Sequence, residues 1–164
     1  MNKQINNKNI QTKDLADNKR AFFDYEILEK FQAGIVLIGQ EVKSIRLGRI
    51  NLAGSFVVAK GNQANPEFYL IGANVPPYQP KNLVTKYDNE RSRKLLLTKR
   101  EISYLIGKTS QKGLTLVALK VYTVRDKIKL EFGIGKGKKK ADKRETIKKR
   151  ETRREIEREL KTRG

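Results

Sequence analysis

The sequence predicts a mainly β domain, an antiparallel barrel that is closed or nearly closed, with two or three short helices and a basic C-terminal tail. Short apolar or alternating stretches recur through residues 19–135 and are separated by turn residues, which is typical of several antiparallel strands. Some of these stretches are joined by short polar turns, as in hairpins. Residues 136–164 differ, because they hold only three large apolar side chains and cannot bury a core of their own.

The first part of the domain is predicted to contain two strands and one helix. Apolar and polar residues alternate over residues 23–27, which favours a half-buried strand, and the apolar run 34–40 favours a buried strand. Over residues 41–47 the apolar spacing becomes helical, and Gly48 stands where a C-terminal cap commonly lies. We therefore expect a short helix there.

Turn and capping residues predict the next elements. Residues 55–60 and 68–73 are interpreted as the strands of a hairpin. The Pro-rich segment 74–89 is predicted to be an exposed loop, long enough to suggest a function. A capping box opens a helix that is expected to span residues 98–107.

The last two strands are predicted over residues 114–124 and 127–134, joined by a polar tip at Arg125 and Asp126. Several strands at short intervals, together with small helices, make the oligonucleotide-binding (OB) barrel the leading candidate for the domain.

Both ends of the chain are expected to lie outside this barrel. Residues 1–18 have few apolar side chains and are predicted to be a disordered leader. The tail, residues 136–164, has 14 Lys+Arg and 6 Asp+Glu, a net charge of +8. We expect this tail to be largely disordered when free and to become helical on a polyanion. A solvated basic tail that aids solubility is an equal alternative. Gly133, Gly135 and Gly137 are interpreted as a hinge that releases it.

The composition excludes several kinds of chemistry. The chain has 37 Lys+Arg against 18 Asp+Glu, a net charge of +19, and it contains no Cys and no His. It therefore cannot build a thiolate or imidazole zinc site, a His-activated nucleophile or a disulfide. No carboxylate pair stands out as an acid and base, and the Gly-rich stretch is not a Walker motif. We expect no cofactor, no metal, no membrane span, a cytosolic location and an anionic partner.

The segment 91–100 is the strongest candidate for an anion-binding surface. It holds five positive charges and no negative one around three leucines. If it is a strand, Leu96 faces away from its leucine neighbours and is displayed beside basic residues, where it could pack on an unstacked base. The alternative is that Leu96 packs under the Pro-rich loop. The basic residues of this candidate surface are Arg91, Arg93 and Lys94. Lys127 and Lys129 share one face of their predicted strand and could extend it, or they could belong to a solvated outer face.

The sequence also resembles the SmpB (small protein B, or SsrA-binding protein) family. The matching segments are NKRAFFDYEI at 18–27, GQEVKSIRLGRINL at 39–52, RSRKLLLTKREI at 91–102 and GKGKKKADKRETIKKR at 135–150. The resemblance implies an OB-like barrel that binds the tRNA-like domain of transfer-messenger RNA. It further implies delivery of that RNA to stalled 70S ribosomes, where the tail becomes helical in an empty mRNA channel near the decoding centre. The protein would be a monomer when free, and no enzyme. A generic OB-type RNA-binding protein with a basic tail is the alternative.

The resemblance assigns roles to individual residues. The RNA-binding face corresponds here to Gln32, Glu41, Lys43, Arg46, Asn51, Leu96 and Lys129. The ribosome-sensing tail corresponds to Gly137, Lys138, Lys139, Asp142, Lys143 and Arg144. The chain departs from the family pattern at three positions: Gln32 replaces a usual Glu, Ala141 replaces a frequent aromatic residue or His, and Tyr87 replaces a common loop His.

Overall fold

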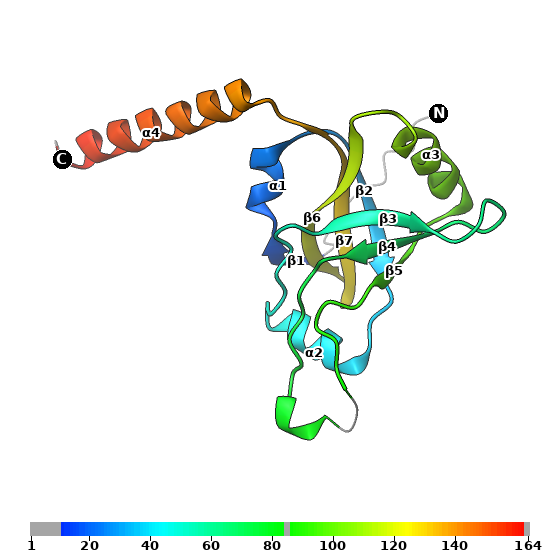
Figure 1. Ribbon diagram of the computed structural model, residues 1–164. Coiled ribbons are helices and arrows are strands. Elements are labelled where there is room, and N and C mark those ends of the chain that lie inside the picture. The colour runs from blue at the N-terminus through cyan, green and yellow to red at the C-terminus, as the bar shows by residue number, and fades with distance from the viewer. Residues whose placement is uncertain (1–10, 84–85, 163–164) are drawn as a thin grey trace.

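The computed structural model describes residues 11–83 and 86–162 and shows a mainly antiparallel β architecture with a long helix projecting from it (Figure 1). The strands are β1 Thr12–Asp17, β2 Tyr25–Ile35, β3 Phe56–Lys60, β4 Glu67–Ile71, β5 Arg93–Leu96, β6 Leu114–Val124 and β7 Lys127–Gly137. The helices are α1 Lys19–Asp24, α2 Gly39–Arg46, α3 Lys99–Thr109 and α4 Lys140–Thr162, with one 3-10 turn at Pro80–Asn82. The prediction of a mainly β fold with three short helices and a basic tail is confirmed.

The sheet closes into a ring because its longest strands pair with neighbouring strands along both edges. The order is β1-β6-β3-β4-β5-β2-β7, and β7 pairs again with β6. One edge of β6 carries β7, while the other is divided between β3 at Leu116 and Val117 and β1 from Lys120 onward. This closed antiparallel ring is consistent with the OB-like prediction.

The interior of the ring is filled by apolar side chains from all of its strands. The largest fully buried apolar residues include Phe68, Leu70, Leu116, Leu130 and Phe132. Both predicted hairpins are present, β3 with β4 and β6 with β7. The tip of the second hairpin has positive φ at Arg125 and Asp126, a conformation that suits a tight hairpin turn.

The predicted leader is wrong for residues 12–17, because they form β1 and pair with β6. The segment needs few apolar side chains, since its backbone hydrogen bonds and the half-buried Leu15 and Ala16 attach it to the ring. The next residue, Asn18, is buried and donates its side-chain amide to the carbonyls of Leu52 and Ala118. The first ten residues of the predicted leader lie outside the described residues.

Two other predictions near the N-terminus need correction. Residues 19–24 form helix α1, so the strand predicted over 23–27 begins only at Tyr25. Asn18 explains the helix, because its side-chain oxygen accepts a hydrogen bond from the N–H of Ala21 and caps the first turn. The buried strand predicted over 34–40 ends at Ile35, and α2 begins at Gly39.

The glycines near the end of β7 do not form the predicted hinge. Gly133 and Gly135 are buried strand residues that pair with β2. A Cβ at Gly133 would lie 2.7 Å from Ile27 Cγ2 and 2.9 Å from the carbonyl oxygen of Glu29. The absence of a side chain therefore allows close packing of β2 on β7, and the chain leaves the sheet only after Gly137.

Helix α4 has no buried residue and projects from the ring into solvent (Figure 1). The tail is thus helical here, and the expectation that it needs a polyanion to become so stays a prediction. Among the described residues, none of the helices combines the length and the apolar character that crossing a membrane requires.

Candidate nucleic-acid interface

Three of the predicted RNA-binding residues meet at one groove of about 360 Å³. Arg46 reaches it from α2, Leu96 from β5 and Lys129 from β7. Apolar side chains of Ile35, Leu37, Val42 and Ile128 also line the groove. The groove thus combines an apolar lining with three cations and one carboxylate, Asp126. This excess of cations suits RNA, because cations neutralise phosphate while apolar groups pack on bases or sugars.

The pairing of the strands brings Leu96 and Lys129 together. Gly34 in the centre of the three strands pairs with Leu96 on one side and with Lys129 on the other. A Cβ at Gly34 would lie 3.2 Å from Leu96 Cδ1, so the glycine leaves room for the leucine to lie over β2. Leu96 is 58% exposed while Leu95 is buried, as the predicted alternation requires. The alternative that Leu96 packs under the Pro-rich loop is therefore wrong.

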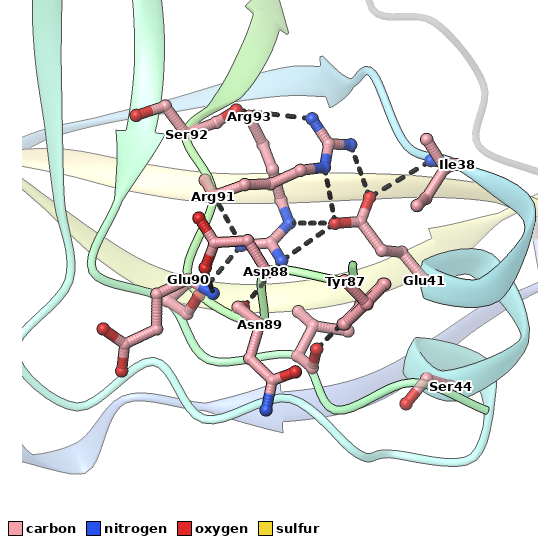
Figure 2. A network of polar contacts seen from close by, with 12 residues as sticks. Ile38, Glu41, Ser44, Tyr87, Asp88, Asn89, Glu90, Arg91, Ser92 and Arg93 are labelled. Carbon is pink, nitrogen blue, oxygen red and sulfur yellow. Dashed lines mark hydrogen bonds and ion pairs between the residues drawn. The ribbon is translucent and has the colours of Figure 1, made fainter. Parts of the chain in front are cut away.

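Glu41 and Arg93 were predicted on the RNA-binding face, but both are fully buried. Figure 2 shows the carboxylate of Glu41 between the guanidinium groups of Arg91 and Arg93. Arg93 Nε donates to Glu41 Oε1 at 2.9 Å, and Arg91 Nε donates to the same oxygen at 2.8 Å. Buried charges need such partners, so the two residues are enclosed by the fold and do not face solvent.

The same network holds the long loop against the sheet. Arg93 donates to the backbone carbonyls of Ala73 and Asn89 at 2.8 and 2.9 Å, close to the two ends of the loop. Glu41 Oε2 also accepts from the N–H of Ile38, which caps α2. One buried cluster therefore joins α2, which carries Arg46, to β5, which carries Leu96.

The other predicted RNA-binding residues lie outside the groove. Gln32 is exposed on β2, two residues before Gly34. Lys43 points to the ring of Tyr78, with its ammonium 5.5 Å from the ring centroid. The exposed Asn51 forms a β-bridge with Asn74. Lys94 forms an ion pair with Glu67, and the hydrogen bond from this lysine lowers the pKa of the Glu67 carboxyl and raises that of the lysine itself.

The beginning of the tail is attached to α1. The N–H of Lys138 donates to the carbonyl of Asp24 at 2.9 Å, and its ammonium donates to the carbonyl of Phe22 at 3.0 Å. Lys143 pairs with the carboxylate of Asp24 at 3.0 Å. Of the other predicted tail residues, Gly137 is the last residue of β7, Asp142 accepts from the N–H of Lys139, and Arg144 is exposed.

Asp24 should control the direction in which α4 leaves the ring. Its pKa is lowered chiefly by the hydrogen bond from Lys143, so the carboxylate stays charged at neutral pH and the ion pair is lost only in acid, below the ordinary value of 3.8. We expect Asp24→Asn to broaden the distance distribution between spin labels on α3 and α4. The chain lacks cysteine, so labels can be attached through Ser103→Cys and Thr152→Cys and measured by pulsed electron paramagnetic resonance.

Glu145→Gln is the matched control for Asp24→Asn. It removes an ion pair with Lys149 that lies wholly within α4, so the distance distribution should stay as in the wild type. A wild-type distribution in Asp24→Asn would show that the ion pair does not hold the tail.

Comparison with known proteins identifies the chain. The sequence pattern of the family described as "SmpB protein" matches residues 15–162. This chain belongs to the SmpB family. It is 49% identical to the SsrA-binding protein of Coxiella burnetii (strain Dugway 5J108-111) over 164 residues, all of both chains. It is 50% identical to the SsrA-binding protein of Carboxydothermus hydrogenoformans over 92% of this chain and 98% of that protein.

A solved structure supports the same membership. A chain from the structure described as "tmRNA-SmpB: a journey to the center of the bacterial ribosome" is 44% identical to this one. The two superpose with a TM-score of 0.60, over 80% of this chain and 93% of that chain.

The candidate site of this SmpB family member also includes residues that the sequence did not predict. The apolar floor of the groove, Ile35, Leu37 and Val42, looks in sequence like ordinary core, and nothing local distinguishes it. Asp24, the partner of the tail, lies 119 residues before Lys143, so no spacing rule could pair them. The one sequence feature that marks Asp24 is its position between Phe23 and Tyr25, in a segment that matches the SmpB family.

Proposed function

We propose that this protein binds transfer-messenger RNA at its tRNA-like domain and delivers it to ribosomes stalled on messages without a stop codon. The observation that carries the proposal is the likeness to SmpB in a tmRNA–ribosome study, at 44% identity over most of both chains. The relatives named SsrA-binding protein support the same RNA partner.

The groove supplies the chemistry that RNA binding needs. Arg46 and Lys129 line it and would neutralise phosphates, which contributes to affinity and makes it depend on salt. Leu96 lines the same groove with more than half of its surface in water and would pack on an unstacked base or on a ribose. Glu41 and Arg93 act indirectly, because they hold α2 and β5 in the positions that bring Arg46 and Leu96 together.

The tail would perform the second step. Residues 136–139 begin it, and α4 continues it from Lys140 as a cationic helix with no buried side chain. A helix of this kind is stabilised where phosphates surround it, as in a ribosomal channel that holds no message. We propose that the tail enters that channel and thereby reports that the ribosome is stalled. The protein would act in the cytoplasm as a monomeric binding protein and not as a catalyst.

Leu96→Ala tests the binding step. We expect it to weaken binding to the isolated tRNA-like domain by about 1–3 kcal/mol, the usual value of one stacking or base contact. Binding is measured by fluorescence anisotropy at one stated salt concentration, with an unstructured RNA of equal length as the specificity control. The wild type should prefer the tRNA-like domain clearly.

Leu160→Ala is the matched control, since Leu160 is also an exposed leucine, at 68%, but lies near the end of α4. It should bind the tRNA-like domain as the wild type does. A wild type that binds both RNAs equally would contradict the proposed function and favour a generic RNA-binding protein. An unchanged Leu96→Ala would show that the groove is not the binding face.

A further inference from the structure

Phe22 is an exposed aromatic residue whose exposure the fold does not explain. It lies on α1 next to the buried Ala21, and 44% of its surface is accessible to water. Of the groups described, Lys30 contacts its ring, with the ammonium 5.5 Å from the ring centroid. Nearly half of a large aromatic residue is therefore left in contact with water.

The surroundings of Phe22 are cationic. Besides Lys30, the ammonium of Lys138 reaches the carbonyl of Phe22 itself, and Lys143 lies over the neighbouring ring of Phe23 at 6.0 Å. The nearby carboxylates are already paired. Asp24 binds Lys143 and Arg20, and Glu131 binds Lys30. These pairs also engage Lys30 and Lys143, but four cations surround the two carboxylates, so an anion that approaches the ring meets a net positive charge.

The outward face of β2 connects Phe22 to the groove. Leu28, Lys30 and Gln32 alternate with less exposed residues, so they stand on one face of the strand. The next position on that face is Gly34, which lies between Leu96 and Lys129. At about 3.3 Å per residue, this row spans about 13 Å from Gly34 to Lys30. It forms one continuous path from the groove to Lys30, which touches Phe22.

We propose that Phe22 is a stacking platform for one unpaired RNA base, so that the RNA-binding surface continues from the groove along β2 to the start of the tail. A base can stack on an aromatic ring whatever its sequence, while Lys30 and Lys138 hold the phosphates on either side of it. The proposal deepens the proposed function and rests on it, since it adds a contact to the same RNA-binding surface. The base comes either from the transfer-messenger RNA or from ribosomal RNA met when the tail enters its channel.

Phe22→Leu in the full-length protein tests the platform. Leucine keeps an apolar side chain of similar size but removes the ring. We expect the dissociation constant to rise about 5- to 150-fold on the RNA that supplies the base. Two binding assays distinguish the sources: anisotropy with the isolated tRNA-like domain, and sedimentation with ribosomes that carry no message. Phe22→Tyr keeps the ring and should bind as the wild type does in both.

Tyr104→Leu is a closely matched control. Tyr104 is 43% exposed and Lys108 lies 5.5 Å from its ring centroid, but it lies on α3 and contacts Glu29 and Phe31 instead of this path. It should leave both dissociation constants unchanged. If Phe22→Leu also matches the wild type in both assays, the platform is wrong. If the wild type itself does not prefer the tRNA-like domain, the proposed function fails, whereas a loss on ribosomes confined to Phe22→Leu would still support the platform.

Discussion

Glu41→Gln should lower the free energy of unfolding by about 3–5 kcal/mol, because it removes the only carboxylate that the structure places on the fully buried guanidinium of Arg93 within the described residues. Glutamine has nearly the same shape as glutamate, so the loss would come from the uncompensated charge and not from a cavity. Urea unfolding followed by circular dichroism measures the change. The midpoint should fall while the dependence on urea stays constant.

Glu67→Gln provides the control for this prediction. Like Glu41→Gln, it removes a carboxylate from an ion pair, here the pair with Lys94. About 40% of each side chain in this pair is accessible to water. Exposed ion pairs contribute little, so the midpoint should hardly move. Equal effects of the two substitutions would contradict the view that burial gives the Glu41 cluster its importance.

We also expect Glu41→Gln to weaken RNA binding under conditions in which it remains folded, because the cluster positions Arg46 and Leu96.

Truncation after Lys138 should abolish tagging of stalled nascent chains and leave binding to the tRNA-like domain intact. Strand β7 ends at Gly137, and the N–H of Lys138 bonds to Asp24, so this cut preserves the sheet and removes residues 139–164, which include all of α4. A cut after Gly135 would instead delete the residues that pair with Glu26 and Tyr25. Because α4 buries no side chain, the ring should fold without it.

Tagging is measured in a reconstituted translation reaction programmed with a message that lacks a stop codon. Anisotropy with the tRNA-like domain is run on the same preparation and serves as the folding and binding control. Loss of RNA binding in the truncated protein would contradict the division between ring and tail. Tagging that persists would show that α4 does not report an empty channel.

Local chemistry predicted several elements well. Thr98 and Glu101 form the predicted capping box, and the helix begins where they require, although it continues two residues beyond Gly107. The alternation of Leu95 and Leu96 correctly predicted which leucine is buried and which is exposed. These features depend on residues within one turn or one strand, where sequence spacing translates directly into geometry.

Long-range features could not be predicted in the same way. β1 was missed because its stability comes from pairing with a strand more than 100 residues later, and its own side chains are mostly polar. Arg93 was placed on the RNA-binding face because a basic residue in a basic segment is normally solvated. Its carboxylate partner, Glu41, lies 52 residues earlier. Gly133 and Gly135 were interpreted as a hinge because glycine is common in flexible segments. Glycine is also used where two backbones approach closely, and the sequence does not distinguish the two uses.

The sequence by itself determined that this chain is a basic, mainly β protein of the SmpB type, with a tail unable to form a core. Those properties follow from composition, from periodicity and from contiguous motifs. Only the tertiary structure decided which basic residues are buried or paired and which line a groove. It encloses Arg93, ties Lys94 to Glu67, gathers Arg46, Leu96 and Lys129 at one groove, and holds the start of the tail against Asp24. Burial and ion pairing are set by partners brought together from distant parts of the chain, and closure of the ring is what brings them together.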